Sequence, residues 1–273
     1  MTEYRSIDSL DGTAISYAHR GAGPGLVIVP GNNRMAHDYD RLAGELADRF
    51  AVSVIDRRGR GASGPQGPDY TLEREIEDLR AVQRAEDAHL VFGHSYGGLV
   101  ALQSARADRS LDRLVVYEPA VSLNGSFDLS FLPDFERLLA AGRRTRAMAL
   151  FLHRTRLTPL PGSTPRVVFL ALAALLVGGR SGVEMRDLMP TTPPELTEVA
   201  RYDSDGATYA EVMAKTLMLG GTKTPAYLLG VLEPLSRVIP RARVELLDGA
   251  DHNAPDESAP RAVAEHLAAF LAG

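Results

Sequence analysis

Short apolar runs alternate with amphipathic stretches along the first half of the chain. Runs of strand length occupy residues 25–29, 52–55, 89–92 and 114–117. Between them, apolar residues recur at helical spacing, as they do in residues 39–50 and 72–82. Strands that alternate with helices are typical of a mostly parallel sheet covered by helices. The pattern therefore predicts the α/β fold class.

This alternation stops at residue 122 and returns after residue 206. The block between them is helical in pattern and interrupted by prolines, whereas residues 216–219 and 244–247 again have the length and apolar character of strands. A non-conforming block inside an α/β chain is best interpreted as an insertion over the functional edge of the sheet. We therefore expect a core of residues 1–121 and 207–273, and a mainly helical lid of residues 122–206.

Composition and charge narrow the range of partners. The 273-residue chain has a formal net charge of −5, which favours neither nucleic acid nor an anionic membrane, and it contains no cysteine. Its longest apolar stretch, residues 167–177, is shorter than the roughly 20 residues of a membrane span, and no basic region followed by an apolar run marks a signal peptide. We expect a cytoplasmic monomer or homodimer that acts on a small molecule, with no nucleic-acid or membrane partner.

A serine flanked by glycines stands where a strand meets a helix. Residues 93–97 read Gly-His-Ser-Tyr-Gly, directly after the apolar run 89–92. In such a G-x-S-x-G turn the serine hydroxyl is exposed above the sheet, and the glycines let neighbouring backbone pass closely. The helix N-terminus behind the serine favours developing negative charge. We therefore expect Ser95 to be a nucleophile rather than a surface serine in a glycine-rich turn.

A nucleophilic serine needs a general base, and His252 is the best placed of the seven histidines. It follows the last expected strand and precedes the closing helix of residues 259–271. Loops that follow the strands of an open α/β sheet meet at one edge, so this loop can reach Ser95. His94 stands beside Ser95 but is held by the turn and points elsewhere, and Asp251 is interpreted as a turn residue.

Four segments, in this order, resemble motifs of the α/β-hydrolase superfamily. Residues 27–31 are similar to the strand and loop that form its oxyanion hole, residues 56–63 to its D-x-R-G-x-G-x-S segment, residues 93–97 to its nucleophile elbow and residues 249–252 to its histidine loop. The resemblance covers nearly the whole chain outside the insertion. It implies the α/β-hydrolase fold, with a lid inserted after the sixth strand. The arginines of residues 57–63 are expected to tie a tight turn rather than to bind an anion.

The resemblance also implies an oxyanion hole formed by the backbone N–H groups of Asn32 and Tyr96. Tyr96 directly follows the nucleophile, where acyl-transfer chemistry needs a donor. Asn32 follows Pro30-Gly31, where the family usually has His-Gly. Three residues of the same loop are candidates for substrate binding, the alternative being a solvated loop. They are Asn33, Arg34 and His37.

The acid that would orient His252 departs from the family pattern. Most members place it after the strand that follows the lid, in a loop reading roughly G-x-x-D, but residues 220–225 contain no carboxylate. Glu118 ends the strand before the lid, at the same sheet edge as Ser95 and His252. Some relatives, including a group of haloalkane dehalogenases, look similar in this respect. We therefore predict that Glu118 is the triad acid. The alternatives are Asp248, Asp251 and Glu233.

These residues predict a serine hydrolase that cleaves an ester, thioester or related acyl bond without a metal or cofactor. The apolar side chains of the expected lid favour a small hydrophobic substrate, because ligand pockets are lined mainly by such side chains. A serine nucleophile argues against the relatives that attack with a carboxylate, such as haloalkane dehalogenases and epoxide hydrolases. Two alternatives stay open on this fold: a cofactor-free lyase, cyclase or acyltransferase, and a ligand-binding receptor with low turnover.

Overall fold

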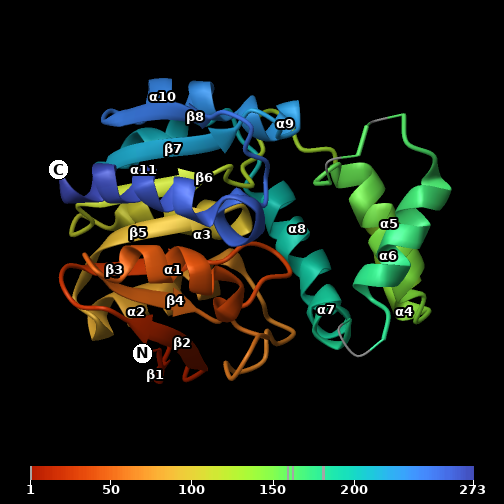
Figure 1. Ribbon diagram of the computed structural model, residues 1–273, viewed down its shortest axis with the longest axis horizontal. Coiled ribbons are helices and arrows are strands. Elements are labelled where there is room, and N and C mark those ends of the chain that lie inside the picture. Colours follow the sequence, from red (N-terminus) through yellow and green to blue (C-terminus); the bar gives the residue numbers. More distant parts are fainter. Residues whose placement is uncertain (1, 159, 162, 180–181) are drawn as a thin grey trace.

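The computed structural model describes residues 2–158, 160–161, 163–179 and 182–273. Within them, one sheet crosses the molecule with the strand order β1-β2-β4-β3-β5-β6-β7-β8 (Figure 1). The strands are β1 (Glu3–Asp8), β2 (Ala14–Arg20), β3 (Gly25–Val29), β4 (Ala51–Ile55), β5 (Ala88–His94), β6 (Arg113–Tyr117), β7 (Lys215–Gly221) and β8 (Ala242–Leu247). The part of the sheet in the order β4-β3-β5-β6-β7-β8 is parallel throughout. Strand β2 is antiparallel to both β1 and β4. The expected α/β class is confirmed.

Helices on both faces of the sheet enclose two apolar layers. The helices of this core are α1 (Asp40–Leu46), α2 (Leu72–Ala85), α3 (Tyr96–Ala107), α9 (Ala226–Leu229), α10 (Leu232–Val238) and α11 (Pro260–Ala272). Because successive strand residues point to opposite faces, Val27 joins the layer under α2, α3 and α10, and Leu26 joins the layer under α1 and α11. Both side chains are fully buried, so the sheet is a rigid support for the loops at its edge.

Between β6 and β7 the chain leaves the sheet and forms a helical segment, residues 122–206. Its helices are α4 (Leu132–Ala140), α5 (Arg144–Thr155), α6 (Arg166–Leu176), α7 (Val183–Leu188) and α8 (Thr192–Arg201). Helices α4, α5 and α6 stand apart from the sheet, with α7 and α8 between them and the core (Figure 1). They pack around a separate apolar cluster that contains Phe131, Phe135 and Phe151. The helical segment therefore has a core of its own.

The sheet begins with an antiparallel hairpin, β1 and β2, which the apolar pattern does not predict. Every residue of β1 is at least partly exposed, and most of them are polar.

In the described part of the chain, no helix combines the length and the apolar character that crossing a bilayer requires.

Candidate active site

Ser95 lies in the tight turn between β5 and α3. Its φ and ψ are 53° and −118°, a conformation that costs energy for a residue with a side chain. A Cβ added to Gly93 would lie 2.5 Å from the carbonyl oxygen of Gly97, and one added to Gly97 would lie 2.1 Å from that of Val29. The turn therefore requires both glycines. It leaves the half-buried Ser95 at the carboxyl end of β5.

His252 and Glu118 meet at the same edge of the sheet. The Nδ1 atom of His252 lies 2.6 Å from Oε2 of Glu118, which follows β6 and is fully buried. The other carboxylate oxygen, Oε1, accepts hydrogen bonds from the Gly221 N–H and the Thr224 hydroxyl, each at 2.6 Å. A carboxylate that faces Nδ1 favours a proton there, which leaves Nε2 of the neutral imidazole free to accept one.

A chain of hydrogen bonds links the loop after β3 to the loop that carries His252. The Gly31 N–H donates to the Tyr39 hydroxyl at 3.0 Å, and this hydroxyl lies 2.7 Å from Nδ1 of His94. Nε2 of His94 lies 2.9 Å from the carbonyl oxygen of His252. Since a carbonyl only accepts, Nε2 of His94 carries the proton and Nδ1 accepts from Tyr39. Burial, and then the proximity of His252 and Arg34, lower the pKa of His94 well below its usual value, so this side chain stays neutral.

Two backbone N–H groups beside Ser95 have no hydrogen-bond acceptor among the residues that the structure describes. They belong to Asn32, in the loop after β3, and to Tyr96, the first residue of α3. This loop packs directly on the elbow, since a Cβ added to Gly31 would lie 3.3 Å from Cβ of Ser95. Neither N–H group is thus committed to an acceptor in the described part of the chain, which is one requirement of an oxyanion hole.

Ser95 and His252 line one cavity of about 400 Å³. In the structure no hydrogen bond joins these two side chains. Much of the remaining wall is apolar and comes from the helical segment. Its lining includes Met148, Phe151, Leu152, Leu172, Leu176 and Met185. The candidate nucleophile and the candidate base thus share a chamber with a largely apolar wall.

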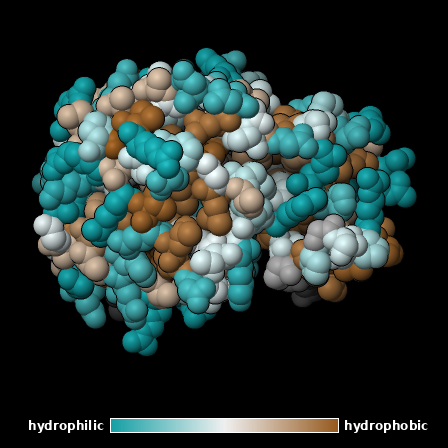
Figure 2. Space-filling model, turned by 90° about the horizontal axis from the view of Figure 1, so that it is seen from above, coloured by the Kyte–Doolittle hydropathy of each residue, from teal (hydrophilic) through white to brown (hydrophobic). Residues whose placement is uncertain are grey.

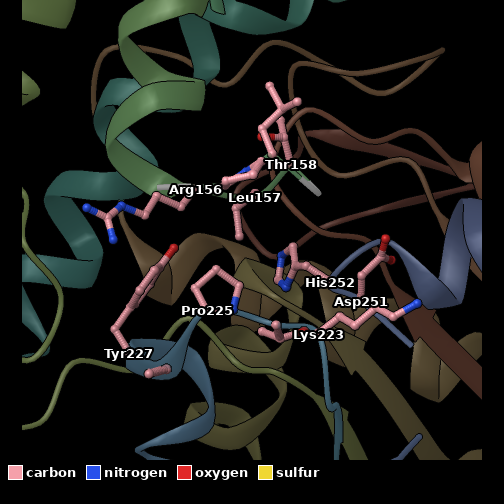
Figure 3. A pocket seen from close by; sticks show the side chains of 12 residues that line it. Arg156, Leu157, Thr158, Lys223, Pro225, Tyr227, Asp251 and His252 are labelled. Carbon is pink, nitrogen blue, oxygen red and sulfur yellow. The ribbon is translucent and has the colours of Figure 1, made fainter. Parts of the chain in front are cut away.

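A second hollow, of about 650 Å³, adjoins His252 on the side of β7 (Figure 3). Leu157, Pro225 and His252 lie around its centre, whereas the side chains of Arg156 and Lys223 extend in opposite directions away from it. Leu157 and His252 also line the cavity beside Ser95. The two spaces therefore meet at the candidate base.

Two of the predicted substrate-binding residues, Asn33 and Arg34, line the cavity beside Ser95. Both are already engaged within the protein. Oδ1 of Asn33 accepts a hydrogen bond from the Thr192 hydroxyl at 3.1 Å. The guanidinium of Arg34 forms ion pairs with Asp256 and Glu257. These two carboxylates compensate much of the positive charge of Arg34, so a substrate in this cavity would interact with a largely neutralised side chain.

The third predicted residue, His37, is not part of the cavity lining. Its Nε2 lies 3.3 Å from Oε1 of Glu184, on the surface between the core and the helical segment. The structure therefore does not support the expected substrate contact. With Asp38, these side chains form the one group in the described part of the chain with the composition of a small metal site, their ligand atoms lying within 4.8 Å of one another.

The arginine-rich turn after β4 is tied internally, as the sequence predicts. Arg57 is 1% exposed and donates to Glu75 at 2.8 Å, to Glu195 at 3.1 Å and to the Gly31 carbonyl at 3.0 Å. Burial raises the pKa of Glu195, but Arg57 and Arg60 outweigh that effect and hold this pKa below its usual value. Because Glu195 belongs to α8, the turn joins the helical segment to the loop that carries the candidate oxyanion hole.

Comparison with known proteins gives a match over most of the chain. A family model described as the alpha/beta hydrolase family matches residues 26–266. A solved structure, an alpha/beta hydrolase from Sphaerobacter thermophilus DSM 20745, is 31% identical to this chain. That match covers 98% of this chain and 100% of the other, with a TM-score of 0.82.

Curated relatives match over shorter stretches. N-formylmaleamate deformylase from Pseudomonas putida is 36% identical over 107 residues, which cover 37% of this chain and 40% of that protein. The uncharacterized protein YqjL from Bacillus subtilis is 26% identical over 132 residues, which cover 46% of this chain and 51% of that protein. The chain thus spans about half the length of these relatives, or less.

Proposed function

Because the chain belongs to the alpha/beta hydrolase family, we propose that it is a serine hydrolase that cleaves an ester, thioester or related acyl bond of a small hydrophobic substrate. The observation that carries this proposal is the 2.6 Å contact between Glu118 and His252 at the cavity that Ser95 lines. Nucleophilic acyl transfer needs a serine hydroxyl, an imidazole that takes its proton and a buried carboxylate that orients the imidazole.

Each of these side chains has one role in the proposed reaction. Oγ of Ser95 attacks the acyl carbon while its proton moves to Nε2 of His252, and Glu118 stabilises the imidazolium at Nδ1. The N–H groups of Asn32 and Tyr96 donate to the oxyanion of the tetrahedral intermediate. The carbon–leaving-group bond then breaks, and the proton on Nε2 passes to the leaving oxygen or sulfur atom, which departs as an alcohol or thiol. Water repeats these steps on the acyl-enzyme, which releases the carboxylic acid and restores Ser95.

We also propose that residues 122–206 act as a lid over the core formed by residues 1–121 and 207–273. The lid supplies Phe151, Leu172 and other apolar residues to the cavity wall, while Ser95 and His252 come from the core. A wall of this kind favours medium-chain or aromatic acyl and alcohol groups over acetate or charged groups. A cavity of about 400 Å³ holds a small molecule of that description.

A fluorophosphonate probe tests this function. Wild-type protein is expected to gain the mass of one phosphonyl group, and Ser95→Ala is expected to remain unlabelled. Ser110→Ala, which alters an exposed serine, serves as the matched control and should label like the wild type. A series of p-nitrophenyl and thioester acyl chains then gives kcat/KM for each chain length. Labelling of Ser95→Ala, or a preference for acetate over longer chains, contradicts the proposal.

The match to N-formylmaleamate deformylase adds a second substrate class, because the name of that relative denotes removal of a formyl group. N-formyl compounds therefore belong in the same series. Labelling at Ser95 without turnover of any ester, thioester or formyl compound would favour the low-turnover receptor instead. Transfer of the acyl group to an added alcohol would favour the acyltransferase.

A further inference from the structure

Helix α6 presents an apolar face to solvent. After Arg166 its sequence contains no polar residue, yet only Phe169 and Ala173 are buried. Leu175 and Val167 are 76% and 69% exposed. The other exposed apolar residues of the helix are Val168, Leu170, Ala171, Ala174 and Leu176. Single exposed apolar side chains are common, but a contiguous apolar face marks an interaction site.

Positive charge surrounds this face. Residues 137–183 contain eight arginines and neither aspartate nor glutamate, although the net charge of the whole chain is −5. Those exposed on α5, on the turn before it and at the start of α6 are Arg143, Arg144, Arg146, Arg154 and Arg166. Figure 2 shows hydrophilic and hydrophobic atoms side by side on the smaller lobe, with hydrophobic atoms reaching its outer end.

A hollow of about 510 Å³ between α5 and α6 combines the two features. Its apolar part is lined by Leu150, Val167 and Leu170. Its cationic part is lined by Arg146, Arg154 and Arg166. One carboxylate, that of Asp134, also lines the hollow and is paired with Arg137. Apolar side chains beside guanidinium groups suit a ligand with an acyl chain and an anionic head group.

The positive charge of this hollow is only partly neutralised. Arg154 pairs with Asp128 at 2.7 Å, whereas Arg146 and Arg166 form no ion pair in the part of the chain that the structure describes. His153 also lines the hollow. Its pKa is lowered, first by burial and then by Arg166 and Arg154, as expected in an uncompensated positive field.

We propose that α6 and the adjoining arginines form a docking surface for a membrane whose lipids carry anionic head groups. The exposed side chains of α6 enter the boundary between head groups and acyl chains, while Arg146 and Arg166 pair with lipid phosphates. Charge argues against a second copy of this chain as the occupant, because two such surfaces facing each other would bring like charges together.

The docking surface lies next to the candidate active site. Leu172, which is half-buried, and Leu176, at the end of the same helix, line the cavity beside Ser95. Because a helix with its side chains is about 10–12 Å across, a docked membrane lies about that far from the cavity. The net charge of the whole chain gives no sign of such a partner, because acidic residues elsewhere in the chain outweigh the arginines of residues 137–183. Binding to the membrane does not depend on the proposed hydrolase activity.

Co-sedimentation with vesicles tests this surface on the intact protein. One set of vesicles contains phosphatidylcholine and phosphatidylglycerol in equal parts, and the other contains phosphatidylcholine alone. Wild-type protein is expected to bind the anionic vesicles, and high salt is expected to weaken that binding. Leu175→Glu and Arg166→Glu should each lower the partition coefficient by roughly tenfold.

Two matched variants control for surface change as such. Leu10→Glu alters a leucine of the core that is also 76% exposed, and Arg261→Glu alters an arginine of α11 whose side chain is 79% exposed. Both should bind like the wild type, and circular dichroism checks that every variant keeps its fold. Wild-type protein that stays in the supernatant, or that binds both vesicle types equally, overturns the proposal. A dimer that Leu175→Glu dissociates, without vesicle binding, assigns the face to a second copy and overturns it too.

Discussion

Nε2 of His94 donates a hydrogen bond to the backbone carbonyl oxygen of His252 across 2.9 Å. The other ring nitrogen of His94 accepts from Tyr39, so this imidazole is fixed at both ends. The imidazole of His252 is fixed separately, by Glu118 at its Nδ1. The position of the candidate base therefore depends on one contact to its backbone and one to its side chain.

His94→Ala removes the backbone contact. It is expected to lower kcat of acyl hydrolysis by roughly 10²-fold with little change in KM, because a displacement of about 1 Å costs that much in catalysis. His94→Gln is the matched variant, since its amide group retains a donor toward the His252 carbonyl. Steady-state kinetics on one ester separates the two parameters. A rise in KM at unchanged kcat, or an equal loss in both variants, would show that His94 does not position the base.

Glu118→Gln alters the side-chain contact. Gly221 and Thr224 donate to Oε1, so the glutamine carbonyl oxygen stays with them and its NH₂ group turns toward His252. The imidazole must then accept at Nδ1 and carry its proton on Nε2, where it cannot take the proton of Ser95. We expect kcat to fall by up to ~10⁴-fold, as measured under substrate saturation.

Two aspartates of the histidine loop control for that result. Asp248 accepts a hydrogen bond from the Thr222 hydroxyl and Asp251 accepts one from the Ser258 hydroxyl, so neither is directed at His252. Asp248→Asn and Asp251→Asn are expected to keep most of the wild-type turnover. If one of them abolishes turnover while Glu118→Gln remains active, the acid lies in the histidine loop.

Arg57→Ala tests the buried ion pairs that join the turn after β4 to α8. The substitution leaves Glu75 and part of the charge of Glu195 uncompensated inside the protein. We expect the free energy of unfolding to fall by about 3–5 kcal/mol, measured by urea denaturation. Arg237→Ala, which removes a side chain that is 74% exposed, should change it by less than about 1 kcal/mol. Similar losses in both variants would show that burial of the pair is unimportant.

Asp256 gives stability a dependence on pH. Burial raises the pKa of Asp256 to about 6, above its usual value of 3.8. A raised pKa means that the folded state holds the proton more tightly, so this contribution to stability is complete below pH ~4 and is lost as the pH rises to ~6. Asp256→Asn should remove that loss, worth about 3 kcal/mol. The measurement is the difference in unfolding free energy between variant and wild type at pH 4 and pH 7. If this difference in unfolding free energy is the same at pH 4 and pH 7, the predicted role of Asp256 is wrong.

The sequence predicts the fold best where a strand is buried on both faces. All residues of β3 are buried, and an unbroken apolar run is the signal that such a strand leaves. β1 has the sequence Glu-Tyr-Arg-Ser-Ile-Asp at the edge of the sheet, where one face and one side meet water. No apolar run marks it, because pairing with β2 defines it, and pairing between segments is not encoded in local hydropathy.

The same limit applies to the site. Ser95 and His252 have local signals: a glycine-flanked turn and a loop between a strand and a helix. Glu118 has a weaker signal, its place at the end of the strand before the lid, and it becomes the candidate because residues 220–225 contain no carboxylate. The contact of His94 with the His252 backbone joins residues 158 positions apart and has no local signal. The positive charge around α6 does have a local signal, but this signal is visible only when charge is counted over residues 137–183 rather than over the whole chain.

Residues 221–224 read Gly-Thr-Lys-Thr, so Thr224 occupies the position of the acid in the G-x-x-D pattern of most relatives. The hydroxyl of Thr224 donates a hydrogen bond to Glu118. An aspartate at this position would set two carboxylates against each other in a buried site, and one would have to stay protonated. Loss of Glu118 first would leave His252 without an acid. If Glu118 is the triad acid, as proposed, either order of substitution passes through an intermediate with lower activity. The place of the acid should follow the deep branches of the family's phylogeny rather than switch back and forth among close homologues.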